Sequence, residues 1–159
     1  MSAGTTDLEA MRLAIAASHE ALEAGNNPYG AVLVSASGEL LHVAGNQQNT
    51  ERDPTAHAEL VLVRQAAARL GAAALRDATV HASGEPCAMC SGALYWAGIR
   101  RIVYAASNEV MNELFGGDQL PIRCAQVLAG ASRQVQVDGP VLAAAAVAEL
   151  KQAAARRKR

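Results

Sequence analysis

Two short stretches, H-A-E at residues 57–59 and P-C-A-M-C at residues 86–90, contain nearly all the side chains able to do difficult chemistry. Each stretch stands near the expected start of a helix. Cys87 and Cys90 are three residues apart, so on a helix their sulfurs point the same way, at a distance that one ion can bridge. Peptide dipoles at a helix start also lower the pKa of a thiol. A C-x-x-C pair alone is equally compatible with a redox pair or with two core thiols.

His57 adds an imidazole to the two thiols and completes a Cys₂His donor set that suits Zn²⁺. Structural zinc sites usually have four protein ligands, and the sequence offers no second C-x-x-C or paired histidine. Three ligands leave a position for water, which zinc activates near neutral pH. Glu59 is close enough in sequence to take a proton from that water and pass it to a leaving nitrogen. We therefore expect His57, Cys87 and Cys90 as zinc ligands and Glu59 as the catalytic carboxylate.

A protein in which zinc is only structural is the alternative from another class. In such a protein the metal would join the two helix starts and nothing more. This alternative gives Glu59 no role and leaves the open coordination position unexplained. A second non-enzyme alternative is an RNA-binding module led by the basic residues 156–159.

The apolar residues outside these stretches follow the periods of one α/β fold. Apolar runs predict strands over residues 31–34, 40–43, 78–82, 102–104 and 135–137. Helical spacing predicts helices over residues 7–24, 54–70 and 86–96, with an alanine-rich helix after Pro140. Helices on both faces of a mixed five-stranded sheet are the simplest cover for strands this apolar. The expected class is therefore α/β, with three layers in the order α/β/α.

The polar segment of residues 46–53 contains no apolar side chain and is expected to be an exposed loop. Asp53 is expected to cap the helix that follows, because Pro54 fits the first position of a helix. The chain would then turn directly from this loop into the helix that carries His57.

Length and composition point to one domain. The chain has 159 residues, of which 51% are hydrophobic and 18% charged, and such a composition excludes a disordered or fibrous protein. We expect one domain over residues 1–155 and a basic tail over residues 156–159. Three cysteines, an odd number, argue against a disulfide framework, and Cys124 is expected to be a buried small hydrophobe.

No segment of the sequence predicts contact with a membrane. The longest purely apolar run, residues 141–148, is far shorter than the roughly 20 residues that a spanning helix needs. The first residues lack the basic and apolar regions of a secretory signal. The expected location is the cytoplasm.

The pattern H-x-E followed by P-C-x-x-C resembles the signature of the cytidine deaminase superfamily. G-A-V-L-V at residues 30–34 and the stretches 53–59 and 85–93 resemble the branch that contains guanine deaminases and tRNA adenosine deaminases. Cytidine deaminases usually have a cysteine where His57 stands, so they are a weaker match. The resemblance implies a cytidine deaminase-like fold and attack of water on the amino-bearing carbon of a ring.

The resemblance also implies roles for residues around the metal. The side-chain amide of Asn46 and the backbone N–H of Ala58 would contact the base. Trp96, the one tryptophan of the chain, is expected either to stack on the substrate or to fill a contact between two copies of a homodimer. Guanine deaminases place a second acid where Val110 stands here, so neighbouring Glu109 is the candidate for that acid.

Charge favours a small substrate over a nucleic acid. An anticodon loop needs a basic groove, whereas the residues flanking the motif are mostly acidic: Glu51, Asp53, Glu85, Glu109, Glu113 and Asp118. The expected function is zinc-dependent hydrolytic deamination of a free nucleobase, guanine or a related aminopurine. Alternatives are cytosine, an s-triazine or 5-azacytosine-like ring, a nucleoside, and adenosine-34 of tRNA. Beyond the substrate, a homodimer is expected and a nucleic-acid partner is not.

Overall fold

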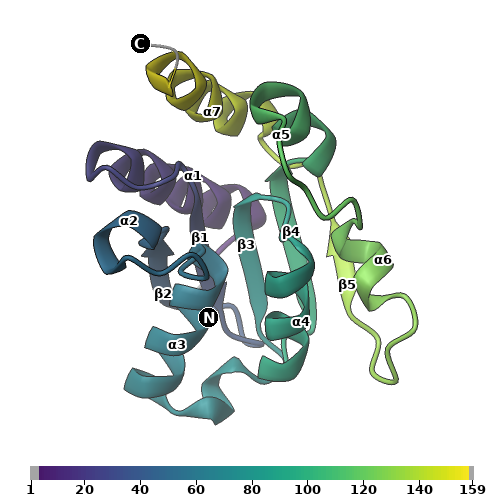
Figure 1. The fold of residues 1–159 in the computed structure, drawn as a ribbon. Coiled ribbons are helices and arrows are strands. Elements are labelled where there is room, and N and C mark those ends of the chain that lie inside the picture. Colours follow the sequence, from purple (N-terminus) through teal and green to yellow (C-terminus); the bar gives the residue numbers. More distant parts are fainter. Residues whose placement is uncertain (1–3, 158–159) are drawn as a thin grey trace.

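The computed structural model describes residues 4–157 and has a mixed five-stranded sheet at its centre (Figure 1). The strands are β1 (Gly30–Val34), β2 (Leu40–Gly45), β3 (Thr79–Gly84), β4 (Arg101–Ala106) and β5 (Gln136–Asp138). Their order in the sheet is β2-β1-β3-β4-β5. β1 is antiparallel to both of its neighbours, whereas β3, β4 and β5 run parallel. The expected mixed sheet is therefore confirmed.

Helices cover both faces of the sheet, which confirms the three-layer α/β/α class (Figure 1). They are α1 (Asp7–Glu23), α2 (Gln48–Glu51), α3 (Ala58–Leu70), the 3₁₀ turn η1 (Ala72–Leu75), α4 (Ala88–Ala97), α5 (Asn108–Phe115), α6 (Cys124–Leu128) and α7 (Ala143–Arg157). α1 and α7 pack on one face, and α3, α4 and α6 form the layer on the other. α5 packs against α7 just after the end of β4.

Alternation along the central strands divides the core between the two helical layers. Val32 and Val103 belong to the cluster with α1 and α7, whereas Leu33 and Ile102 belong to the cluster with α3 and α4. Successive side chains of a strand point to opposite faces, so a strand covered on both sides needs apolar residues at every position. All five residues of β1 are buried, as its G-A-V-L-V sequence predicts.

The helix that carries His57 starts later than expected. The sequence places its first position at Pro54, whereas α3 begins at Ala58 with extended His57 as its N-cap residue. The reason is a local turn: the Asp53 carboxylate accepts hydrogen bonds from the Thr55 N–H (2.8 Å) and hydroxyl (2.7 Å). Asp53 therefore caps a turn ahead of the helix, and the predicted helix start was wrong.

The polar segment of residues 46–53 is also more ordered than expected, because it contains the one-turn helix α2. The Asn26 side-chain oxygen accepts hydrogen bonds from the N–H groups of Asn49 and Thr50, both at 3.0 Å. Asn26 thus caps the N-terminus of α2, because Gln47 at the N-cap position makes no side-chain hydrogen bond to the helix. The expectation of a fully exposed loop was wrong, and Asn46 is only 2% exposed.

The expected basic tail falls partly within the described residues. Arg156 and Arg157 are the last two residues of α7, whereas Lys158 and Arg159 lie outside the described part of the chain. Arg156 donates to Glu23 at 2.7 Å, and Arg157 donates to Asn27 at 2.7 Å. Over residues 4–157, no helix is both long and apolar enough to cross a bilayer.

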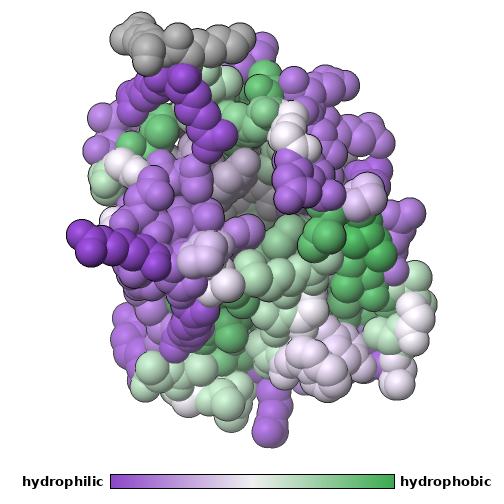
Figure 2. Space-filling model, in the orientation of Figure 1, coloured by the Kyte–Doolittle hydropathy of each residue, from purple (hydrophilic) through white to green (hydrophobic). Residues whose placement is uncertain are grey.

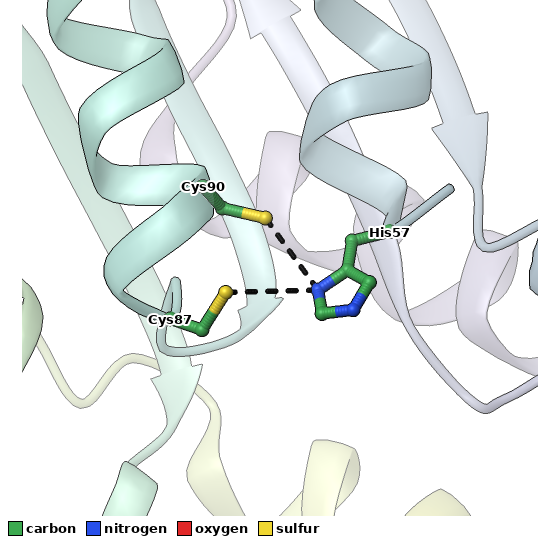
Figure 3. A group of neighbouring side chains, drawn as sticks. All are labelled: His57, Cys87 and Cys90. Carbon is green, nitrogen blue, oxygen red and sulfur yellow. Dashed lines mark hydrogen bonds between the residues drawn. The ribbon is translucent and has the colours of Figure 1, made fainter. Parts of the chain in front are cut away.

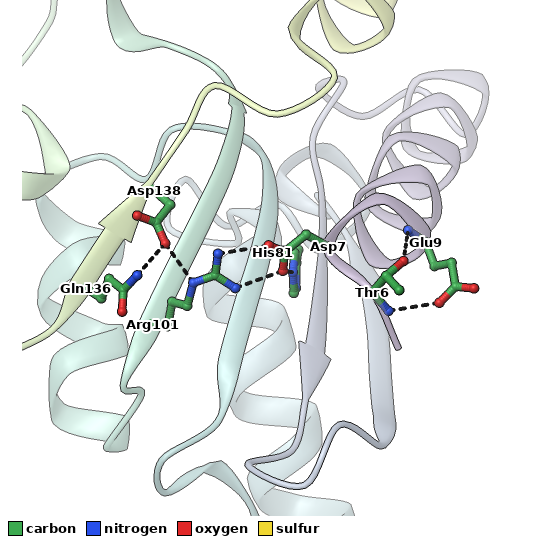
Figure 4. A network of polar contacts seen from close by, with 7 residues as sticks. All are labelled: Thr6, Asp7, Glu9, His81, Arg101, Gln136 and Asp138. Atoms are coloured by element: carbon green, nitrogen blue, oxygen red, sulfur yellow. Dashed lines mark hydrogen bonds and ion pairs between the residues drawn. The ribbon is translucent and has the colours of Figure 1, made fainter. Parts of the chain in front are cut away.

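An ion-pair network joins the start of α1 to the sheet (Figure 4). The Asp7 carboxylate accepts two hydrogen bonds from Arg101, both at 2.8 Å, and lies 2.8 Å from His81 Nε2. Arg101 also donates to Asp138 of β5 at 2.7 Å. The hydrogen bonds from Arg101 lower the pKa of Asp7 from 3.8 to about 2. The network therefore joins α1, β3 and β4 through the Asp7 carboxylate, and Arg101 extends it to β5 through the Asp138 carboxylate.

Asp7→Asn is expected to lower the free energy of unfolding near neutral pH. It should also make this free energy depend less on pH in the acid range. The pKa of Asp7 is 3.8 when unperturbed and about 2 in the fold. Ionised Asp7 therefore stabilises the wild type fully above pH 3.8, and this contribution is lost as the pH falls through about 2. Urea unfolding at successively lower pH measures the difference between the two proteins. That difference should shrink with falling pH, and a constant difference would contradict the assignment. Asp118→Asn, at an exposed loop carboxylate, is the control.

Candidate functional site

Two helix starts bring together the three expected metal ligands (Figure 3). His57 is the N-cap residue of α3, Cys87 is the N-cap residue of α4, and Cys90 lies in the first turn of α4. The His57 Nδ1 atom lies 3.7 Å from Cys87 Sγ and 3.6 Å from Cys90 Sγ. The three ligand atoms all lie within 4.8 Å of one another. His57 thus meets two cysteines that lie 30 and 33 positions further along the chain.

The geometry of these donors fits a zinc ion. Zinc binds imidazole nitrogen at about 2.0–2.1 Å and thiolate sulfur at about 2.3 Å, so a tetrahedral angle puts the two ligand atoms about 3.6 Å apart. The observed nitrogen–sulfur distances of 3.6 and 3.7 Å match this separation. Three protein donors also leave one tetrahedral position for a further ligand.

The thiol pair favours one thiolate even before a metal binds. Hydrogen bonds from Cys90 and His57 lower the pKa of Cys87 to about 4. The same contact raises the pKa of Cys90, because the Cys90 S–H donates a hydrogen bond to the Cys87 sulfur and keeps its proton. His57 has a raised pKa for a related reason, its hydrogen bond to Cys87. The three groups act as one coupled set of donors.

Glu59 lies in the first turn of α3, beside the metal donors. Glu59 is only 5% exposed, and burial raises the pKa of its carboxyl group to about 7. Glu59 also lines the same cavity as His57 and Cys87. A carboxyl in such a position is placed to accept a proton from a ligand in the cavity and to return it.

The cavity beside these residues has a volume of about 280 Å³. Its wall is rich in carboxamides, contributed by several elements: Asn27, Gln48, Asn108, Asn112 and Gln119. Carboxamides both donate and accept hydrogen bonds. Tyr29 lies in the same wall, and burial raises its pKa to about 12, so it stays a neutral phenol. The wall therefore suits a flat ligand with donors and acceptors around its edge.

Of the other expected site residues, the structure brings only Ala58 to the cavity. Asn46 lies behind the wall, where it donates to the side chain of Gln48 at 2.7 Å and accepts from its N–H at 3.0 Å. Gln48 is thus the amide that this segment presents to the cavity. Trp96 is 84% exposed and lies outside the lining described for the cavity, so the structure does not support stacking on the substrate.

Glu109 also lies outside the lining that the described residues form. Its side chain is 76% exposed and its carboxylate is 3.7 Å from Arg123. The helical period explains this position: the cavity face of α5 consists of Asn108, Met111, Asn112 and Phe115. Glu109 projects from a different side of the helix, so the expected second acid does not face the metal donors.

Sequence reasoning missed a buried carboxylate that organises the site. Glu85, only 4% exposed, accepts hydrogen bonds from the N–H groups of Asn108 (3.0 Å) and Cys124 (3.1 Å), and from Arg123 (3.0 Å). It thereby fastens the starts of α5 and α6 to the loop that leads into Cys87. Its place directly before P-C-A-M-C was the one signal in the sequence.

A family model described as "Cytidine and deoxycytidylate deaminase zinc-binding region" matches residues 5–106. The chain belongs to this deaminase family. It is accordingly a hydrolytic deaminase, and the His57, Cys87 and Cys90 group, which lies close enough together to bind a metal, falls within the matched residues.

Individual relatives carry different substrate names. The "Probable cytosine deaminase" of Schizosaccharomyces pombe is 36% identical over 143 residues, which are 86% of this chain and 85% of that protein. The "Guanine deaminase" of Bacillus subtilis is 40% identical over 99 residues, 62% of this chain and 63% of that one. Proteins named tRNA-specific adenosine deaminase are found as well. The family is thus established, whereas the names do not agree on a substrate.

Among solved structures, NE0047 in complex with 2,6-diaminopurine superposes with a TM-score of 0.84. It is 26% identical, and the match covers 97% of this chain and 84% of that one. The structural similarity therefore covers nearly all of this chain, including residues after 106 that the family model does not match.

Proposed function

We propose that this deaminase acts on a free nucleobase, guanine or a related aminopurine, and releases ammonia. The observation that carries the proposal is the wall of the cavity, in which His57, Cys87 and Glu59 lie together with five carboxamides. Such a wall complements the alternating donors and acceptors on the edge of a purine. The 2,6-diaminopurine complex of NE0047 supports the same substrate class.

In this proposal His57, Cys87 and Cys90 would hold Zn²⁺, and the ion would act as a Lewis acid that activates water near neutral pH. Glu59 takes a proton from the water and delivers it to a ring nitrogen as the water oxygen bonds to the amino-bearing carbon. Glu59 then takes the second proton from the hydroxyl group now on that carbon and passes it to the amino group. The C–N bond breaks, the amino group leaves as ammonia, and the carbon keeps the oxygen as a carbonyl. Ala58 offers its N–H to the ring, because the first N–H groups of a helix have no partner within it.

Cytosine is the second candidate substrate, because the relative from Schizosaccharomyces pombe is named for it and matches 86% of the chain. A tRNA substrate has less support. Of the described residues that line the cavity, Arg157 is the one arginine or lysine, so a phosphate backbone would find few partners.

Ammonia release by the zinc-loaded protein tests the proposal. The panel is guanine, cytosine, a triazine analogue, guanosine, cytidine and an adenosine-34 tRNA stem-loop. We expect guanine to be deaminated fastest. Activity on cytosine alone would favour the second candidate, and activity on the stem-loop alone would contradict the charge argument. If the zinc-loaded protein releases no ammonia from any substrate of the panel, a structural role of the metal is favoured.

We further propose that two copies associate through the outer face of α4. Met89 and Trp96 are seven residues apart and share one face of this helix, and the exposed Leu120 lines a surface hollow together with Met89. Apolar residues gather over this part of the surface in Figure 2. A Cβ built on Gly92 would meet nothing within 4 Å, so the backbone of a second copy can approach α4 closely there. Exposed apolar patches of this kind mark interaction sites.

Trp96→Glu is expected to convert the proposed dimer into a monomer, because a symmetric contact places the new charge in the interface twice. Sedimentation velocity measures the mass of each form. Leu70→Glu is the matched control, since Leu70 is also an exposed apolar residue, 42% exposed, but lies at the end of α3. A wild-type monomer, or equal dissociation by the control, would overturn the proposed interface.

A further inference from the structure

The last turn of α7 brings one arginine into the wall of the cavity. Arg157 lines the same cavity as His57, Cys87 and Glu59, although about seventy residues or more separate it from them in the chain. Its neighbour Arg156 turns away and donates to Glu23 at 2.7 Å. Two consecutive arginines at one helix end thus have different surroundings, and only one of them faces the site.

Two neutral groups hold Arg157 in place. One terminal nitrogen donates to Asn27 Oδ1 at 2.7 Å. The guanidinium carbon lies 4.6 Å from the centre of the Phe115 ring, a distance at which a cation is attracted to an aromatic face. Asn27 and Phe115 are themselves part of the cavity wall. Both contacts orient the guanidinium, and neither brings a negative charge to it.

Within residues 4–157, Arg157 has no carboxylate partner, in contrast to Arg156 and Arg123. A guanidinium has five N–H donors, and the described residues give Arg157 one hydrogen bond. Arg157, Glu59 and Tyr29 all line the cavity. Burial raises the pKa of Tyr29, the positive charge of Arg157 lowers it, and the negative charge of Glu59 raises it. Arg157 and the catalytic carboxylate therefore act within one small space.

We infer that Arg157 is a specificity-determining residue that donates hydrogen bonds to a carbonyl oxygen of the substrate ring. The site then prefers an aminopurine that carries an oxo group to the same ring without one. The inference rests on the proposed function, because it assumes that a base occupies the cavity with its amino-bearing carbon beside the metal donors. An oxygen acceptor satisfies donors of Arg157 that an unsubstituted ring would leave unpaired.

The test compares guanine with 2-aminopurine, which has the same purine skeleton and the same amino group but lacks the oxo group and the ring N–H beside it. Arg157→Met keeps an unbranched, flexible side chain, although a shorter one, and removes the charge and the donors. We expect it to lower the guanine to 2-aminopurine ratio of kcat/KM by about 10- to 100-fold, the effect of losing a hydrogen bond from a charged donor. Most of the change should lie in KM for guanine, because the oxygen is bound before and during the reaction.

Arg156→Met is the matched control and should leave the ratio unchanged, since Arg156 pairs with Glu23 on the outside. Arg157→Lys should restore part of the ratio, because an ammonium keeps the charge without the planar fork. An unchanged ratio in Arg157→Met, or an equal loss for both rings, would overturn the inference. Guanosine 5′-monophosphate forms a further arm: if Arg157→Met affects this nucleotide alone, Arg157 binds a phosphate and the inference is wrong.

Failure of the proposed function is visible separately, as a wild type that releases no ammonia from either ring. In that case the same ratio is measured from dissociation constants by calorimetry on the zinc-loaded proteins. Tighter binding of guanine that disappears in Arg157→Met would still support the inference. Equal affinity for the two rings, or no binding of either, would overturn it.

Discussion

Glu59→Gln is expected to lower kcat by roughly 10²- to 10⁴-fold, the usual contribution of a positioned acid–base group. The carboxamide has the size of the carboxyl but cannot take a proton from water and return it to the ring. Glu59 is 5% exposed, lines the cavity and stands two residues from His57, so bulk water is a poor substitute for it. Ammonia release from the best substrate of the panel measures the effect.

The zinc content and thermal stability of Glu59→Gln should remain close to those of the wild type, because Glu59 belongs to the wall and not to the donor set of His57, Cys87 and Cys90. Glu51→Gln is the matched control: Glu51 is an acid on nearby α2, exposed and outside the described lining of the cavity, and its variant should keep full activity. An active, zinc-loaded Glu59→Gln would favour a purely structural metal.

The two cysteine donors could be predicted from the sequence because their spacing and their chemistry are local. The spacing of Cys87 and Cys90 within one turn, and the need of both thiols for a cation, do not depend on the rest of the fold. The buried strand β1 is equally local, since five consecutive small or apolar residues fit a strand covered on both faces. Each of these features is decided within a few residues of the chain.

The walls of the site depend on contacts between distant segments and were harder to predict. Asn26 caps α2 from 23 residues away. With this contact the segment expected to be a loop forms a helix, and its residue Gln48 lines the cavity. On α5 the inward face alternates amides with Met111 and Phe115, so it lacks the apolar stripe that usually identifies a buried face. Glu109 was chosen because it is adjacent to Val110, and adjacency in sequence does not show which side of the helix lines the cavity.

Cys90→Ala is expected to abolish both zinc binding and deamination. Removal of one of three protein donors leaves a pair that holds zinc weakly, so the zinc content should fall from about one ion per chain to nearly none. Bound zinc also stabilises the fold by about 4 kcal/mol when free zinc is about 1,000 times its dissociation constant. The variant should therefore unfold at a lower temperature in the presence of zinc, and a chelator should lower the melting temperature of the wild type alone. Metal analysis, ammonia release and thermal unfolding measure the three effects.

Cys124→Ala separates metal binding from packing, because Cys124 and Cys90 are both 0% exposed. Each replacement removes one buried sulfur, and a small cavity of this kind costs about 1 kcal/mol. Cys124 lies outside the His57, Cys87 and Cys90 group, so its variant should keep zinc and activity and show only the packing cost. Equal loss of zinc from both variants would mean that the effect of Cys90→Ala is a general loss of structure. Zinc lost from Cys90→Ala alone would identify the sulfur of Cys90 as a ligand.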